Sequence, residues 1–221
     1  ESLNFENYVK AFEKLNMKST FVNTLLYTAA SVVILAILCG TTAWAISRCH
    51  RKFFKFAYVY FIVGILIPYQ ALFLPIYTIG YRMKLTNTRY GIILMYVATG
   101  ISFGVFLMTS FMNTVPLELE ESARIDGCSV FQTYFKIVLP LLKPAMATFQ
   151  IWNDYLLASL YVSKKQLKTL TVAIQSLFSA QSSDYTTAMA AIVISVLPIA
   201  VLFMALQKYF IKGMTVGAVK G

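Results

Sequence analysis

Charged residues are scarce in this chain of 221 residues. Asp, Glu, Lys and Arg make up 13% of it, against about 25% in an ordinary soluble domain, whereas 58% of its residues are hydrophobic. The mean hydropathy is +0.68. This composition excludes an ordinary soluble domain and is typical of a membrane protein.

Residues that carry chemistry are scarce as well. Three cysteines are too few and too scattered for a disulfide framework, and Cys39 lies in an apolar run. The single histidine, His50, lies in a basic cluster, where a surface position at the lipid headgroups is expected. An integral-membrane enzyme would need clustered His, Asp or Cys. We therefore expect no catalytic residue, metal or cofactor in this chain.

Two further absences narrow the function. The sequence contains no G-x-x-x-x-G-K-[ST] phosphate loop, so any ATP chemistry must come from another chain. It also shows no convincing internal repeat and few charges inside apolar runs, which disfavours a secondary transporter. The net charge of +10 comes from basic residues between the apolar runs, which indicates loops at a headgroup surface and not nucleic-acid binding.

Long apolar runs predict an all-α transmembrane helix bundle. A helix needs about 20 mostly apolar residues to cross ~30 Å of hydrocarbon, and backbone groups in lipid must be satisfied internally. Four runs are clear, and a weaker one is interrupted by Asn153 and Asp154. The expected spans are Ser19–Ser47, Phe56–Tyr81, Tyr90–Leu117, Pro144–Ser163 (the weaker run) and Tyr185–Gln207.

Local features refine these expectations. Small residues in the first run favour close helix packing, with a lipid-facing anchor as the alternative. Pro68 and Pro75 predict a kink or break in the second run, which either borders a pathway or serves packing. A short interfacial helix is expected over Leu170–Phe178. Residues 1–18 are expected to form an extracytoplasmic surface segment after a missing first span, because neither an initiator Met nor a signal peptide precedes them.

One polar stretch, Glu118–Pro140, lies between apolar runs, and we call it the polar loop. Pro116 closes the preceding helix, and three acids within four residues suit the positive end of a new helix. Gly127 permits a turn, after which the chain returns to the membrane until Pro140. Such a helix-turn-helix suits docking into a groove of a soluble partner. On spacing alone, an ordinary amphipathic connection is the alternative.

With the polar loop in the cytoplasm, ten Lys and Arg residues lie on that side and nine on the other. Three of the nine belong to residues 1–18, and omitting them gives ten against six. The positive-inside rule agrees with this orientation by a small margin.

The polar loop resembles the EAA loop of ABC importer permeases. That pattern is carried here by Glu121, Ser122, Ala123, Gly127, Ile137, Leu139 and Pro140, with Ser122 in place of the usual alanine. The segments IPYQALFLPIY, WNDYLLA and QKYFIKGMTVGAVKG resemble the carbohydrate, maltose-permease-like branch. The resemblance implies a permease domain over residues 19–212, with a coupling loop at about 116–140 and a cytoplasmic tail at 213–221.

The resemblance also implies partners and a location. It predicts a multi-pass subunit of the bacterial inner or plasma membrane that imports sugars, with a non-sugar solute as the alternative. Two cytoplasmic ATPase subunits would bind ATP and Mg²⁺, and a second permease subunit and an extracytoplasmic sugar-binding protein would complete the importer. The residues implied to contact the ATPase are Glu121, Ser122, Ala123, Arg124, Asp126 and Gly127, and Gly213, Gly217 and Gly221 are implied as a second contact.

The weaker run departs from the family pattern. Only eight residues separate Lys143 from Trp152, enough for about 12 Å of helix, so we expect that a segment near 148–151 is missing. In a continuous sequence, Asp154 would instead be buried near mid-membrane, where an acid indicates a functional site. Aromatic faces stack on sugar rings and polar groups bond hydroxyls. Trp152, Asn153, Asp154 and Tyr155 are therefore predicted to line a sugar route, with membrane-interface anchoring as the alternative for Trp152.

Overall fold

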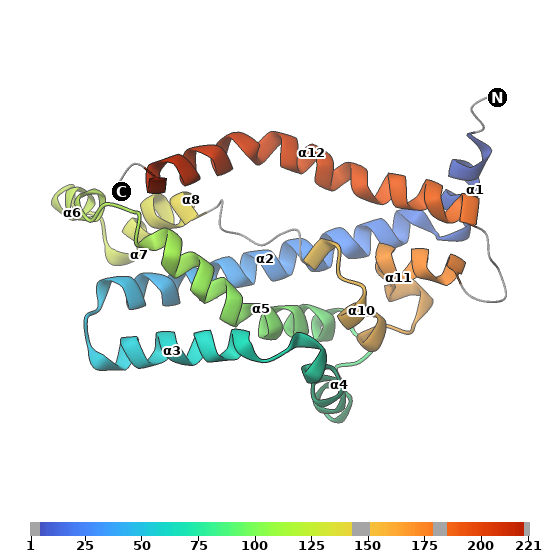
Figure 1. Ribbon diagram of the computed structural model, residues 1–221, viewed down its shortest axis with the longest axis horizontal. Helices are drawn as coiled ribbons and strands as arrows, with labels where there is room; N and C mark the ends of the chain where they lie inside the picture. The colour runs from blue at the N-terminus through green and yellow to red at the C-terminus, as the bar shows by residue number, and fades with distance from the viewer. Residues whose placement is uncertain (1–4, 143–150, 179–184, 219–221) are drawn as a thin grey trace. The chain divides into compact units, whose positions relative to one another are not determined.

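The computed structural model describes residues 5–142, 151–178 and 185–218, and all regular structure in these ranges is helical. Figure 1 labels the main helices. They are α1 (Glu6–Lys14), α2 (Met17–Arg48), α3 (Lys52–Leu66), α4 (Phe73–Arg82), α5 (Arg89–Met112), α6 (Glu118–Ile125), α7 (Val130–Thr133), α8 (Leu139–Leu142), α10 (Leu156–Tyr161), α11 (Leu170–Gln175) and α12 (Tyr185–Ala218). Short turns of 3₁₀ helix, η1 (Tyr69–Leu72), η4 (Lys165–Leu167) and η5 (Ser176–Phe178), and a π turn, η2 (Tyr134–Val138), complete the described chain.

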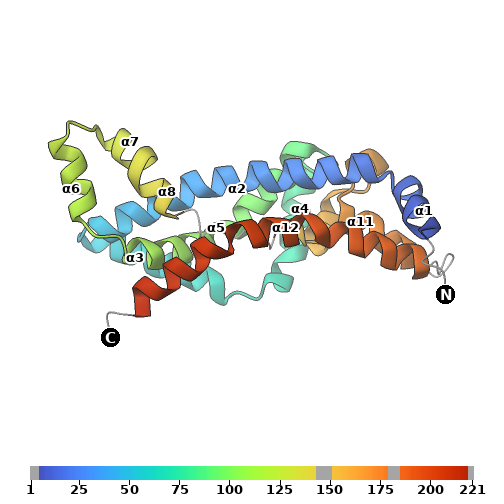
Figure 2. The ribbon, with the colours of Figure 1, turned by 90° about the horizontal axis from the view of Figure 1, so that it is seen from above.

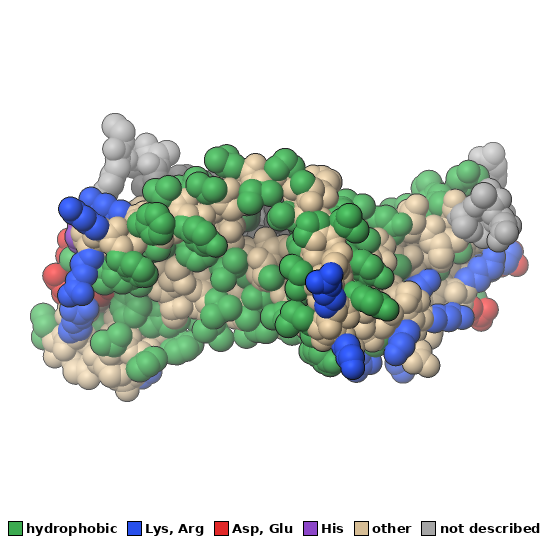
Figure 3. Space-filling view, turned by 90° about the horizontal axis from the view of Figure 1, so that it is seen from below, with side chains coloured by type: hydrophobic (Ala, Val, Ile, Leu, Met, Phe, Trp, Pro, Cys, Tyr) green, Lys and Arg blue, Asp and Glu red, His purple; other side chains and the backbone are tan. Residues whose placement is uncertain are grey.

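Two of these helices, α2 and α5, are long and apolar enough to cross a membrane. They match the first and third predicted spans to within a few residues. On the face shown in Figure 3, hydrophobic side chains cover broad areas, as lipid contact requires.

The apolar stretch Tyr185–Val201 begins α12. This helix continues to Ala218, so residues 213–218 of the expected tail are helical, and Gly221 lies outside the described residues.

The second predicted span is broken, as its prolines indicated. α3 ends at Leu66, and the axis of η1 and α4 is bent by 92° from that of α3. Ile67, directly before Pro68, is extended, with φ −74° and ψ 121°. Proline disfavours the helical conformation of the residue before it, which explains why the break falls here. Pro75 lies in the first turn of α4, where proline is tolerated.

The weaker predicted span, Pro144–Ser163, is wrong as a continuous helix. Within its described part, the helix that contains Trp152 ends at that residue, and α10 begins only at Leu156. The Asp154 carboxylate accepts the backbone N–H of Ala158 at 3.0 Å, and such local side-chain bonds compete with helix formation. The expected missing segment near 148–151 falls largely in residues 143–150, outside the described residues.

The chain divides into two compact units, which are described separately. Unit 1 comprises Glu1–Ser31, Leu72–Tyr96 and Thr148–Ala205. Unit 2 comprises Val32–Ala71, Val97–Ala147 and Leu206–Gly221. The long helices α2, α5 and α12 contribute residues to both.

The core of unit 1 draws on α1, α11 and α12. Ala11 of α1 is fully buried there, so residues 1–18 hold a packed helix and not only a surface segment. The predicted helix over Leu170–Phe178 is present as α11 and η5. Leu170 and Ile174 are buried in this core, so α11 packs its apolar side against other helices, and its position at a membrane interface stays a prediction.

The core of unit 2 lies where α2, α5 and η2 meet. Its buried members include Ala36, Cys39 and Ala43 of α2, as the small residues of that run predicted. A Cβ built on Gly104 of α5 would lie 2.7 Å from the Cys39 Sγ. These helices therefore approach too closely for a larger residue at this position.

Candidate functional site

The polar loop folds as a helix, a turn and a second helix, as predicted. Figure 2 shows α6, α7 and α8 following one another around this turn. Gly127 has φ +80°, its N–H donates to the Arg124 carbonyl, and the Cys128 N–H donates to the Ala123 carbonyl. This pair of bonds is a Schellman motif, in which glycine is favoured because it adopts positive φ without strain. The predicted role of Gly127 in the turn is confirmed.

The second helix begins with a capping box that sequence reasoning missed. The Ser129 Oγ accepts the Gln132 N–H at 3.3 Å, and the Gln132 Oε1 accepts the Ser129 N–H at 2.8 Å. The signal was present as Ser-x-x-Gln directly after the turn. The turn is therefore held by backbone bonds at the end of α6 and by side-chain-to-backbone bonds at the start of α7.

A buried ion pair joins α6 to α2. Glu120 is 1% exposed, and its Oε1 accepts from Arg48 Nε and Nη2 at 2.8 Å each. Its Oε2 accepts from Trp44 Nε1 at 2.7 Å, and Arg48 Nη2 also donates to the Val115 carbonyl at 2.9 Å. A buried carboxylate is tolerable only when its charge is paired and its oxygens are bonded, and both conditions hold here. We call this set of contacts the Glu120 joint.

The sequence indicated only part of the Glu120 joint. Arg48 was assigned to the basic cluster at the headgroups, and Glu120 to the first turn of a helix. Trp44 and Arg48 are four residues apart and so share one face of α2. That spacing could have indicated a paired site, but the acid that completes it lies 72 residues further along the chain from Arg48.

Tyr134 fixes the other side of the loop. It is 2% exposed, its hydroxyl donates to the Ala36 carbonyl at 3.2 Å, and its ring stacks on Trp44 with centroids 5.6 Å apart. Burial raises the pKa of the Tyr134 phenol to about 12, with a smaller contribution from the Cys39 thiol. The hydroxyl therefore stays protonated near neutral pH and remains a donor.

The outer face of the loop is exposed. Of the residues predicted to contact a partner, Glu121, Ser122, Arg124, Asp126 and Gly127 are exposed. Ala123 is 3% exposed, because it shares the inner face of α6 with Glu120 three residues earlier. Its predicted role as a docking contact stays a prediction.

Large apolar side chains on the outer face were missed. Ile125 is 86% exposed and Phe131 is 76% exposed, on opposite sides of the Gly127 turn. An exposed apolar residue in a membrane protein is unremarkable at lipid depth, but these lie among charged residues in a polar loop. At the end of the loop, Ile137 and Leu139 are half-buried and Pro140 is exposed.

The segment predicted to line a sugar route is used mainly for packing within unit 1. Trp152 is 6% exposed, its Nε1 donates to the Ser195 carbonyl at 3.3 Å, and its ring meets Phe21 edge-on. Asp154 is half-buried, its Oδ2 accepts from the Tyr96 hydroxyl at 3.1 Å, and its carbonyl accepts from Thr171 at 2.7 Å.

Only two of the four predicted route residues have exposed side chains, namely Asn153 and Tyr155.

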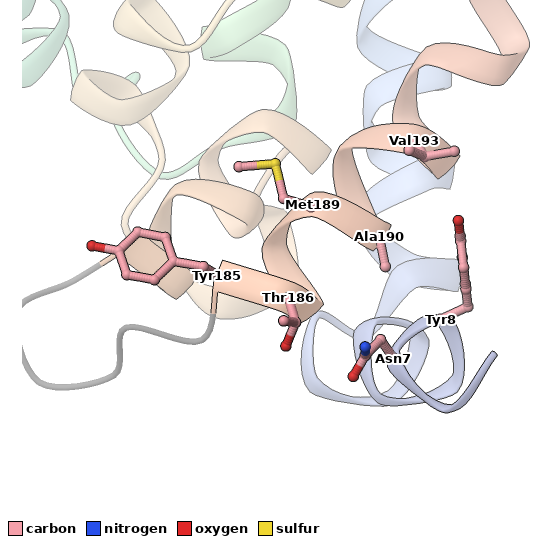
Figure 4. A pocket seen from close by; sticks show the side chains of 7 residues that line it. All are labelled: Asn7, Tyr8, Tyr185, Thr186, Met189, Ala190 and Val193. Atoms are coloured by element: carbon pink, nitrogen blue, oxygen red, sulfur yellow. The ribbon is translucent and has the colours of Figure 1, made fainter. Parts of the chain in front are cut away.

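An open groove lies elsewhere in unit 1, between α1 and the start of α12 (Figure 4). Its lining residues are Asn7, Tyr8, Tyr185, Thr186, Met189, Ala190 and Val193. In the described ranges, no group of three or more His, Cys, Asp or Glu side chains is placed to hold a metal ion.

The helical fold and the polar loop define a membrane permease component, and comparisons identify its family. Residues 32–216 match the family described as binding-protein-dependent transport system inner membrane component. The chain belongs to this family. The identification as an ABC transporter permease is thus confirmed, and the alternative of a secondary transporter is not supported.

Relatives match along the whole chain. A probable starch degradation products transport system permease of Thermoanaerobacterium thermosulfurigenes is 37% identical, over 100% of this chain and 82% of that protein. The melibiose/raffinose/stachyose import permease of Bacillus subtilis is 35% identical, over 99% of this chain and 82% of that protein.

A solved structure of a bacterial ABC transporter, involved in the import of the acidic polysaccharide alginate, has the same fold. It aligns with a TM-score of 0.77 and 24% identity, over 95% of this chain and 81% of that chain. The predicted all-α permease architecture is thereby confirmed.

Proposed function

We propose that this protein is the permease subunit of an ATP-driven importer that carries oligosaccharides or related sugars across a bacterial cell membrane. Relatives named for starch degradation products, for melibiose, raffinose and stachyose, and for maltodextrin match over nearly the full chain. In this proposal two partner ATPase subunits bind ATP and Mg²⁺. A second permease subunit and an extracytoplasmic sugar-binding protein complete the importer.

The observation that carries the proposed mechanism is the two-sided construction of α6. Its inner face is fixed to α2 by the Glu120 joint, whereas its outer face is exposed. A force applied to the outer face is transmitted to α2, because the joint combines an ion pair with two further hydrogen bonds. ATPase closure at the polar loop would therefore displace a membrane-spanning helix.

The outer face has the chemistry of a docking surface. Ile125 and Phe131 supply exposed apolar anchors, and Glu121, Arg124 and Asp126 supply a charged rim. Buried apolar anchors surrounded by polar groups are the usual arrangement of a helix docked in a groove. Ile125 and Phe131 are proposed as the central contacts, in addition to the predicted residues.

A sugar route in unit 1 would use the two exposed residues of the WND segment. The Tyr155 ring is 37% exposed and offers a face for stacking, and the Asn153 amide is exposed for bonds to hydroxyls. Trp152 and Asp154 would then hold the segment in place from behind.

The experiment is transport by the importer reconstituted with its partner subunits in proteoliposomes. Asp126→Lys reverses a rim charge, and we expect ATP hydrolysis to continue while sugar uptake falls at least tenfold. Glu13→Lys, at an exposed acid on α1, is the matched control and should leave both rates unchanged. Normal uptake by the Asp126→Lys importer would count against the proposed contact, and a wild-type complex that imports no sugar would count against the proposed function.

A further inference from the structure

Gly40 of α2 forms a notch against which the Tyr134 side chain lies. A Cβ built on Gly40 would meet the Tyr134 hydroxyl oxygen and would lie 3.4 Å from the Tyr134 Cζ. The same hydroxyl donates to the Ala36 carbonyl at 3.2 Å. Ala36 and Gly40 are four residues apart, and the Cβ of a helical residue leans toward the preceding turn, so a side chain at position 40 would cover this carbonyl. Glycine here therefore gives Tyr134 access to the backbone of α2.

Tyr134 also contacts the Glu120 joint. Its ring stacks on Trp44 with centroids 5.6 Å apart, and the Trp44 Nε1 donates to the Glu120 Oε2 at 2.7 Å. Trp44 therefore lies between the residue that fixes α6 and the residue that fixes η2. Positions four apart lie on one side of a helix. The contacts on α2 form one such row: Ala36, Gly40, Trp44 and Arg48.

Two attachments along one row restrain the polar loop more than a single attachment does. Ala36 and Arg48 are 12 residues apart, which is about 18 Å along an α-helix. A loop held only through Glu120 could pivot about that residue when it is pushed, and α2 would then keep its orientation. A second contact further along the same row opposes this pivoting. A push on the loop is therefore passed to α2 as a change of orientation.

The backbone at Tyr134 is also unusual. Tyr134 begins the π turn η2, in which the Leu139 N–H donates to the Tyr134 carbonyl five residues earlier. Single π turns are rare and occur frequently at functional sites. Tyr134 is 2% exposed, so a partner protein cannot touch its ring. Any effect of Tyr134 on transport must therefore act through the helices that it joins.

We propose that Tyr134 is a second positioning residue for coupling, which acts with Glu120 to fix the polar loop to α2 at two points. This inference rests on the proposed function and deepens it, because it names the contact that keeps the loop from pivoting. Movement of the loop by a partner ATPase then turns this part of α2 together with the loop. Loss of the second contact leaves the loop attached but lets it move without α2.

The test is the ratio of ATP hydrolysed to sugar imported by the complete importer in proteoliposomes. Tyr134→Phe keeps the ring and removes only the hydroxyl, and we expect the ratio to rise about threefold, within the range of one neutral hydrogen bond. Gly40→Ala places a methyl group against the hydroxyl, and we expect a rise of about tenfold, as for an overpacked core. A merely structural role would lower hydrolysis and uptake together and leave the ratio unchanged.

A double variant tests whether the notch and the hydroxyl act on each other. Gly40→Ala with Tyr134→Phe removes the oxygen that the new methyl group would meet, and the remaining distance to Cζ, 3.4 Å, is an ordinary contact. The ratio should therefore return to that of Tyr134→Phe alone. Gly104→Ala is the matched control, because its Cβ would lie 2.7 Å from the Cys39 Sγ in the same core and would not contact the polar loop. It should leave the ratio as in the wild type.

Each of three results would overturn the proposal. A wild-type ratio in Tyr134→Phe would show that the hydroxyl bond is not used in coupling. A raised ratio in Gly40→Ala that Tyr134→Phe does not relieve would separate the notch from Tyr134. An equal rise in Gly104→Ala would assign the effect to packing of the core.

Failure of this inference is distinguishable from failure of the proposed function. A raised ratio in Glu120→Gln, beside wild-type ratios in the variants at positions 40 and 134, would refute only the second contact. A wild-type complex that imports no sugar would refute the proposed function itself.

Discussion

Two acids at loop-to-helix contacts, Glu120 in unit 2 and Asp154 in unit 1, are held in different ways. Glu120 meets the Arg48 guanidinium and the Trp44 indole N–H, so its charge is compensated by an opposite charge. The bonds to Asp154 come from the Tyr96 hydroxyl and from backbone N–H groups, all of them neutral donors. Removing one partner of the ion pair at Glu120 should therefore cost much stability, because it leaves a buried charge unpaired. Removing Asp154 should cost less, because only neutral donors lose their acceptor.

The largest loss of stability should follow Glu120→Ala. It leaves Arg48 without its partner, and removing one member of a buried pair costs about 3 to 5 kcal/mol. The Arg48 side chain is 22% exposed, so we expect the lower end of this range. The free energy of unfolding, measured by denaturant titration in detergent, checks this.

The double variant Arg48→Met with Glu120→Leu is its control. It removes both charges and fills the site with apolar groups, so it should be more stable than Glu120→Ala alone. Additive losses from the two positions would show that they act independently, and the description of a joint would be wrong.

A smaller loss is expected for Asp154→Ala, about 1 to 3 kcal/mol, because Tyr96 and the Ala158 N–H lose a partly buried acceptor. Asp154→Asn keeps one acceptor oxygen and should retain most of the stability. Unfolding in detergent distinguishes the two variants. Equal losses would mean that the negative charge itself is needed, which would remove the contrast with Glu120.

Gly127→Val tests the turn of the polar loop. No atom lies within 4 Å of a Cβ built at this position, so the cost arises from the positive φ alone. We expect a loss of about 1 to 2 kcal/mol, and less for Gly127→Asn, since asparagine adopts this conformation more readily. If both variants were as stable as the wild type, the Schellman motif would not be what holds the turn.

The smallest effect on stability should come from Ile125→Ser. The side chain is 86% exposed, and surface substitutions usually change stability by less than about 0.5 kcal/mol. Sugar uptake should nevertheless fall, because an apolar anchor of the proposed ATPase contact is lost. An importer with unchanged uptake would remove Ile125 from that contact.

The loop architecture was predictable from the sequence because its signals are local. Pro116 and the acidic first turn indicated where α6 begins, and Gly127 indicated where it ends. The prolines of the second run likewise indicated the break between α3 and α4. Each of these effects acts within one or two helical turns of the residue that causes it.

What could not be predicted depends on contacts between distant segments. The partner of Glu120 lies in α2, and the bond from Tyr96 to Asp154 joins residues 58 positions apart. The burial of Trp152 and of the apolar side of α11 depends on which helices pack beside them. The burial of Ala123 was partly predictable, because its spacing from Glu120 places both on one face of α6.

The central claim is that motion of the polar loop reaches α2 through the Glu120 joint. The ratio of ATP hydrolysed to sugar imported tests it most directly, measured in proteoliposomes for the wild type and for Glu120→Gln. This substitution keeps the shape and an acceptor but removes the charge that pairs with Arg48. We predict that hydrolysis continues, uptake falls and the ratio rises several-fold. A ratio equal to that of the wild type would contradict the claim.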